Sequence, residues 1–238
     1  GLGVAPARPK GVGDPTVLVD VIGETIEARD GTSDEPVLMP RKLKLYYDYK
    51  GLSLKPAVVV RAHDDGFDLV YKFVNGTGEP RPLGALGVGF FTLGAKVTYL
   101  APAGAGGERL ADIKKFESDS FVYPTRAYSP VMVVRNDRYA VGVNVLYPVE
   151  EYKHDVRVSL VNADEAASDA LPGGRGWAVD VRLSNCGDER DEGLLKHSAM
   201  MRPGEERQYT IAVRISKRPG EWIRTLAPYR DYFASLYG

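Results

Sequence analysis

Apolar and polar residues alternate with a period of two along most of this chain. Four runs are the clearest, and their apolar members are Phe67, Leu69, Tyr71 and Phe73; Tyr139, Val141, Val143, Val145 and Tyr147; Trp177, Val179, Val181 and Leu183; and Tyr209, Ile211, Val213 and Ile215. This period is typical of a β-strand with one buried face. Repeated between Thr16 and Lys217, the pattern predicts roughly a dozen strands.

Two turn signals join neighbouring strands of this series. Asp64-Asp65-Gly66 separates the alternating runs 56–63 and 67–75, and Asn136-Asp137 separates two further runs. Short Asp, Asn and Gly segments between alternating runs are typical of β-hairpins. With 26 Gly and 16 Pro in 238 residues, turns are frequent. The chain is therefore predicted to be all-β, with antiparallel strands in two packed sheets.

The two ends of the chain depart from this pattern. Residues 1–15 are rich in Gly and Pro without a hydrophobic period, which predicts a flexible lead-in. At the other end, helical spacings of three and four relate Trp222, Leu226, Tyr229, Phe233 and Leu236, with Pro228 where a helix begins or breaks. We expect a β-domain over 16–218 and a short helical segment or linker over 219–238.

Composition and charge exclude several classes of function. A net charge of -1 gives no global attraction to nucleic acid or to an anionic membrane, so neither partner is expected. No apolar run approaches the roughly 20 residues of a membrane-spanning helix. Cys186 is the single cysteine, so no intramolecular disulfide can form. The chain starts at Gly1, and we expect a processed or cut N-terminus; the compartment stays open, secretion or a periplasmic location included.

An acidic cluster with one histidine follows the strand that ends near Tyr147. In an extended segment, Glu150, Tyr152 and His154 share one face, where a carboxylate and an imidazole could act as an acid–base pair. The alternative is a polar strand end after Pro148, with charged side chains that are exposed to solvent at the edge of the sheet. The pattern favours this alternative, and Glu150 and His154 are kept as the catalytic candidates.

Neither a metal site nor a cofactor is predicted. His63, His154 and His197 are the three histidines, and their spacing matches no local zinc motif. The acidic runs around Asp65 and Asp191 do not follow the spacing of a calcium loop. Motifs for nucleotide binding, redox chemistry and serine hydrolysis are also missing.

Tyrosines near strand ends are the more promising candidates for ligand binding. Aromatic rings stack on the C–H faces of sugars, while neighbouring polar groups hydrogen-bond the hydroxyls. The candidate saccharide-binding residues are Tyr123, Tyr128, Tyr147, Tyr152 and Arg126. Tyrosines also occur in ordinary sandwich cores, where each phenol needs a partner, so both interpretations stay open.

The strands from Lys42 to Lys217 and the helical exit "WIRTLAPYRDYFASLYG" together resemble a known architecture. The resemblance is to the large β-supersandwich of the galactose-mutarotase-like superfamily, as it occurs N-terminal to the catalytic (β/α)₈ barrel of multidomain glycoside hydrolases. The segment "YSPVMVVRNDRYAVGVNVLYPVEEYKHDVRVSLV" is the most suggestive. The two histidines and the glutamate of true mutarotases have no residue-by-residue match here, so no catalytic role is carried over.

The resemblance implies a non-catalytic, carbohydrate-associated domain that supports or binds saccharide for a glycoside hydrolase-like protein. Its expected partners are a saccharide or polysaccharide and a catalytic barrel domain or partner chain. One alternative is an aldose-epimerase-type or other carbohydrate-active enzyme that uses a His/Glu pair. A second alternative is a structural sandwich that acts through protein contacts, with an apolar patch around Trp222 and Phe233.

Overall fold

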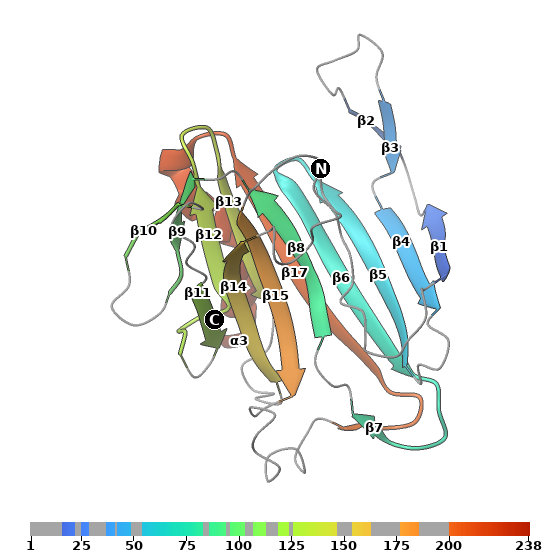
Figure 1. Cartoon of the computed structure of the whole chain (residues 1–238). Coiled ribbons are helices and arrows are strands. Elements are labelled where there is room, and N and C mark those ends of the chain that lie inside the picture. The colour runs from blue at the N-terminus through green and yellow to red at the C-terminus, as the bar shows by residue number, and fades with distance from the viewer. Residues whose placement is uncertain are drawn as a thin grey trace.

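A computed structural model gives the architecture of the chain (Figure 1). It describes residues 16–21, 25–28, 37–40, 42–48, 54–82, 86–93, 96–102, 107–112, 119–123, 126–146, 154–162, 177–185 and 200–238. The predicted lead-in, 1–15, lies outside these residues, as do Tyr147, Glu150 and Tyr152.

The larger sheet contains nine antiparallel strands within the described part of the chain. In spatial order they are β1 (Thr16–Val21), β4 (Lys42–Asp48), β5 (Leu54–His63), β6 (Gly66–Asn75), β17 (Glu206–Ser216), β13 (Ala140–Leu146), β12 (Val131–Arg135), β9 (Lys96–Leu100) and β10 (Arg109–Asp112). The last long strand, β17, thus pairs with both β6 and β13 in the middle of the sheet.

A second antiparallel sheet packs across the larger one (Figure 1). Its strands in order are β11 (Asp119–Tyr123), β14 (His154–Asn162), β15 (Trp177–Asn185) and β8 (Leu86–Leu93). Two short pairs complete the described strands: β16 (Met200–Met201) with β7 (Arg81–Pro82), and β2 (Thr25–Ala28) with β3 (Val37–Pro40). The prediction of an all-β, antiparallel two-sheet supersandwich is therefore confirmed.

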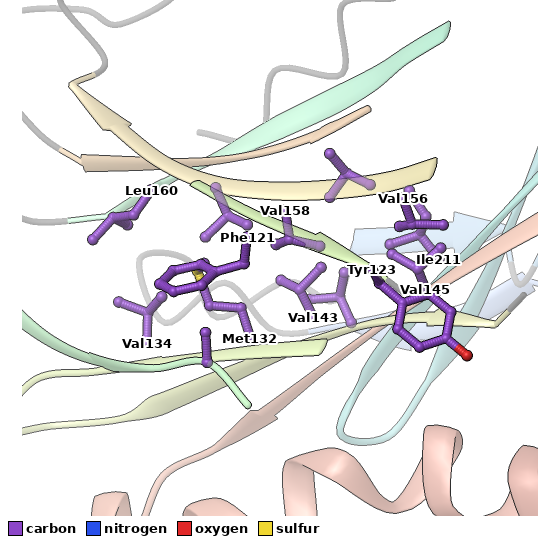
Figure 2. Packing of buried hydrophobic residues seen from close by; sticks show 14 of the residues in the cluster. Phe121, Tyr123, Met132, Val134, Val143, Val145, Val156, Val158, Leu160 and Ile211 are labelled. Atoms are coloured by element: carbon purple, nitrogen blue, oxygen red, sulfur yellow. The ribbon is translucent and has the colours of Figure 1, made fainter. Parts of the chain in front are cut away.

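The main hydrophobic core fills the space between the two sheets. Its side chains come from alternate positions of strands in both layers (Figure 2): Leu69, Tyr71, Phe73, Tyr99, Phe121, Met132, Val134, Val143, Val145, Val156, Val158, Leu160, Trp177, Val179, Val181, Tyr209, Ile211 and Val213. We call the side of the large sheet that carries this core its inner face. The predicted alternation holds along β6, β13, β15 and β17, although Ile215 near the end of β17 is 42% exposed.

Both predicted hairpins are confirmed. The β5–β6 turn is Asp64-Asp65, and Gly66 already pairs with His63 as the first residue of β6. A Cβ at position 66 would lie 2.0 Å from the Val213 carbonyl oxygen, so glycine is needed there for the close approach of β17. In the β12–β13 turn, the Asn136 side chain accepts hydrogen bonds from the backbone N–H groups of Arg138 and Tyr139.

The C-terminal segment packs on the opposite, outer face of the large sheet. It consists of the 3₁₀ helix η3 (Pro219–Leu226) and the α-helix α3 (Ala227–Tyr237), with Pro228 in the first turn of α3. Asn144 of β13 donates through Nδ2 to the Thr225 carbonyl oxygen at 2.9 Å and to the Ala212 carbonyl oxygen at 3.1 Å. The short C-terminal helix predicted from the sequence is confirmed, and η3 extends it toward β17.

Candidate functional site

Of the predicted acid–base pair, Glu150 lies outside the residues that the structure describes. Tyr147 and Tyr152 lie outside them too. His154 is the first residue of β14 and is opposite Asn185 in the register with β15. The catalytic role of Glu150 and His154 stays a prediction.

The other three saccharide-binding candidates lie within one short stretch of chain. Tyr123 ends β11 and is only 5% exposed, with its ring in the core (Figure 2). Its side chain hydrogen-bonds the phenol of Tyr229 on α3. Burial raises the pKa of Tyr229, and the bond with Tyr123 partly opposes that increase. Tyr123 thus joins the sandwich to the C-terminal helix.

Arg126 and Tyr128 are exposed on the loop that follows. Backbone hydrogen bonds hold this loop: the Arg126 N–H donates to the Val122 carbonyl oxygen at 2.6 Å, and the Tyr128 N–H donates to that of Pro102 at 2.7 Å. The Tyr128 side chain is 78% exposed. Of the predicted binding residues whose side chains the structure describes, these two are accessible to a ligand.

A polar cluster that the sequence did not predict joins the edges of the two sheets. Asp119 on β11 accepts hydrogen bonds from the Tyr99 phenol at 2.6 Å and from Arg109 Nη1 at 2.7 Å. Burial, reinforced by the hydrogen bond to the Asp119 carboxylate, raises the pKa of Tyr99 to about 12. The Arg109 guanidinium also lies 5.9 Å from the centroid of the Phe121 ring. This cluster is suited to fastening the two layers together.

A second polar cluster lies on the outer face, at the β5–β6 turn. Arg214 donates through Nη1 to Asp68 Oδ1 at 2.8 Å, and His63 Nε2 lies 2.8 Å from Asp68 Oδ2. Arg214 Nε is also 3.3 Å from Asp65 Oδ1. Both oxygens of the Asp68 carboxylate thus have partners, as expected of a residue that orients its neighbours rather than one that exchanges protons with a substrate.

A small hollow of about 10 Å³, room for a single water molecule, lies between β9, β12 and η3 on the outer face. The residues that line it are Thr98, Tyr99, Leu100, Glu108, Val133, Arg135 and Trp222. Arg135 and Glu108 form an ion pair at its rim. Trp222 was expected in a C-terminal helix, but its meeting with β9 and β12 depends on strand order, which no local pattern reveals.

Two further expectations concern metal ions and membranes. Among the described residues, no group of three or more His, Cys, Asp or Glu side chains could hold a metal ion. No helix in the described part of the chain is long and apolar enough to cross a membrane. Asn75 is buried and has a structural role: its Nδ2 donates to the carbonyl oxygens of Glu79 and Met201.

Comparison with known proteins places this geometry in a recognised fold. No family model and no curated protein match the sequence. Among solved structures, a candidate aldose 1-epimerase of Escherichia coli K12 matches with a TM-score of 0.51 and 12% identity, over 82% of this chain and 68% of that protein. The GH36 α-galactosidase AgaA of Geobacillus stearothermophilus matches with a TM-score of 0.50 and 10% identity, over 90% of this chain.

This chain has the galactose-mutarotase-like fold. The predicted resemblance is therefore confirmed at the level of architecture. The match covers only 29% of AgaA, so this chain spans less than a third of the α-galactosidase. At identities of 10% and 12%, the galactose-mutarotase-like fold is shared, and catalytic residues are not transferred from either protein.

Proposed function

We propose that this chain is a non-catalytic, carbohydrate-associated domain that binds or supports saccharide for a glycoside hydrolase-like protein. The match to AgaA carries this proposal. Nearly the whole chain, 90% of it, corresponds to less than a third of that α-galactosidase, as expected of an accessory unit beside a larger catalytic part.

The partner that this function requires is a catalytic barrel domain, in the same polypeptide or in a separate chain. An apolar face on α3 supports such a contact. Tyr229, Phe233 and Tyr237 follow one another at intervals of four residues, and the rings of Phe233 and Tyr237 are 4.7 Å apart between centroids. Phe233 and Tyr237 are each 46% exposed. Aromatic side chains on a rigid helix are typical of protein interfaces.

The saccharide contact that we propose uses Tyr128 and Arg126. An exposed tyrosine on a loop held by backbone bonds loses little conformational entropy when a sugar ring stacks on it. Arg126 adds hydrogen-bond donors for hydroxyl groups beside that ring. Tyr147 and Tyr152 are retained as further candidates for this contact.

The test is a glycan array followed by calorimetric titration of the positive saccharides. We expect at least one galactose- or glucose-containing saccharide to bind, and Tyr128→Ala and Arg126→Ala to weaken it severalfold. Arg138→Ala is the matched control, because Arg138 is also an exposed arginine in a turn. A chain that binds no saccharide on the array or in solution contradicts the proposed function.

An aldose-epimerase-type enzyme is the second candidate function. The match to the Escherichia coli protein favours it, since that match covers 68% of the other chain and so corresponds to most of a protein. Its proposed acid–base pair is Glu150 and His154. Polarimetry of freshly dissolved α-D-galactose distinguishes the two functions. An enzyme accelerates the approach to the equilibrium rotation, and Glu150→Gln or His154→Asn abolishes the acceleration; a rate equal to that in buffer rules the enzyme out.

A further inference from the structure

One carbonyl group fixes the start of the loop that carries Arg126 and Tyr128. The N–H groups of Arg126 and Ala127 both donate to the Val122 carbonyl oxygen, at 2.6 and 2.9 Å. The Ala127 side chain is buried, so it packs inward between the two exposed candidates for saccharide contact. The placement of Arg126 and Tyr128 therefore depends on the peptide group that joins Val122 to Tyr123.

The far end of this loop is bound to the large sheet. The Tyr128 N–H donates to the carbonyl oxygen of Pro102, just after β9, at 2.7 Å. The Pro130 carbonyl oxygen accepts from the Val145 N–H of β13 at 3.0 Å. Strands β9 and β13 belong to the large sheet, whereas Val122 lies on β11 of the small sheet. The loop thus spans the two layers, and its first anchor is only as fixed as the end of β11.

The end of β11 is supported by α3. Among the described strands β11 pairs with β14 alone, and its last residue, Tyr123, lies opposite Val156. The Tyr123 side chain is buried and hydrogen-bonds the phenol of Tyr229. Because β11 is an edge strand, this bond gives its last residue a contact from outside the small sheet, next to the peptide group on which the loop depends.

Tyr229 is itself held in the first turn of α3. Thr225, four residues earlier, is buried, and its carbonyl oxygen accepts from Asn144 Nδ2 at 2.9 Å. Pro228 lies in the first turn of the helix, and the rings of Tyr229 and Phe233 are 6.3 Å apart between centroids. A phenol on an anchored helix is ordered in advance, so it can fix its partner at a low cost in conformational entropy.

We propose that Tyr229 is a positioning residue for the saccharide contact. Its hydrogen bond to Tyr123 fixes the end of β11, and the Val122 carbonyl group passes this constraint to the loop. The inference rests on the proposed saccharide function and adds to it a residue that does not touch the ligand. It makes α3, which the sequence predicts only as a helical segment or linker, part of the framework of the binding loop.

Amide hydrogen exchange in Tyr229→Phe tests this link, because the variant keeps the ring and removes the phenol oxygen. Exchange is read residue by residue by NMR on the full chain. We expect the Arg126 and Ala127 amides to exchange about two- to tenfold faster, the change that corresponds to the loss of one neutral hydrogen bond. Tyr123→Phe should have the same effect, and the two effects should not add in the double variant. Tyr139→Phe is the matched control, since Tyr139 is a half-buried tyrosine just before the other end of β13.

Calorimetric titration measures the consequence for binding. The probes are raffinose, which contains both galactose and glucose, and any saccharide that is positive on the glycan array. We expect Tyr229→Phe to bind severalfold more weakly than the wild type, and Tyr139→Phe to bind with unchanged affinity. Circular dichroism establishes that each variant is folded, and Tyr123→Phe supplies the same test if Tyr229→Phe does not fold.

The outcomes separate this role from the broader function. Unchanged exchange at Arg126 and Ala127, or faster exchange over α3 alone, overturns the inference and leaves the saccharide function standing, because Tyr229 then only holds the helix. Faster exchange in the loop with unchanged saccharide affinity overturns it as well. If the wild-type chain binds no saccharide, the proposed function fails, and the exchange data alone then decide whether α3 positions the loop.

Discussion

Gly142 of β13 lies directly beneath Thr225 of η3, so closely that a Cβ at position 142 would be 2.3 Å from Thr225 Oγ1 and 2.6 Å from Thr225 Cβ. Thr225 is only 2% exposed at this contact. Because Gly142 has no side chain, the C-terminal segment packs closely against the backbone of β13. The same contact positions Trp222, three residues earlier, over β9 and β12.

Gly142→Ala is expected to destabilise the chain by about 1–3 kcal/mol, because the added methyl group must displace Thr225 from a packed position. Urea unfolding monitored by circular dichroism measures the change in the free energy of unfolding. Gly78→Ala is the matched control, since a Cβ at position 78 meets no atom within 4 Å. Equal stability of the two variants would contradict the close contact between β13 and η3.

Asn144→Ala is expected to cost about 1–3 kcal/mol and to loosen η3, because the variant leaves the carbonyl oxygens of Thr225 and Ala212 without this donor. Hydrogen exchange read by mass spectrometry should show faster exchange over residues 219–237, with β14 and β15 unchanged. Gln208→Ala, at an exposed position of β17, should change neither the free energy of unfolding nor the hydrogen exchange over residues 219–237. Unchanged exchange in Asn144→Ala would mean that other contacts hold the segment.

The sequence predicts the strands and their faces well, but not which strands meet. Alternation alone assigns Val143 to the core, because a strand with one buried face repeats every two residues. It also leaves Gly142 on the other face, with nothing to indicate that Thr225, far along the chain, covers it. The partner of an outer-face residue depends on strand order and on the path of η3. For the same reason the Trp222 hollow was missed, although Trp222 was expected in the C-terminal helix.

Arg214→Ala is expected to lower stability by about 1–3 kcal/mol, since it removes a charged partner from the Asp68 carboxylate. Both side chains are largely buried, 12% exposed for Arg214 and 15% for Asp68, so water replaces the lost interaction poorly. Arg218→Ala is the control: Arg218 is 77% exposed in its pair with Glu221, and the expected cost is about 0–1 kcal/mol. Thermal unfolding of the two variants side by side makes the comparison, and an equal loss in both would show that burial does not strengthen the Arg214 pair.

The cluster of Tyr99, Asp119 and Arg109 predicts a loss of stability in alkali. The pKa of Tyr99 is about 12 in the folded chain and near 10.0 in an unfolded one. Below pH 10 both states keep the phenol proton, so the contribution of Tyr99 to stability is fully present. As the pH rises from about 10 to about 12, the unfolded chain releases the proton first, and the free energy of unfolding falls.

Tyr99→Phe should therefore be less stable than the wild type near neutral pH, because the bond to Asp119 is gone, yet lose less stability between pH 10 and 12. Urea unfolding at a series of pH values measures both effects. Tyr128→Phe is the control, because the Tyr128 side chain is 78% exposed. The free energy of unfolding of this variant should fall with pH as steeply as that of the wild type. If the free energy of unfolding of Tyr99→Phe falls as steeply between pH 10 and 12 as that of the wild type, other groups cause the loss of stability in alkali. A shallower slope would identify Tyr99 as the proton-holding member of the cluster that joins β9 and β10 to β11.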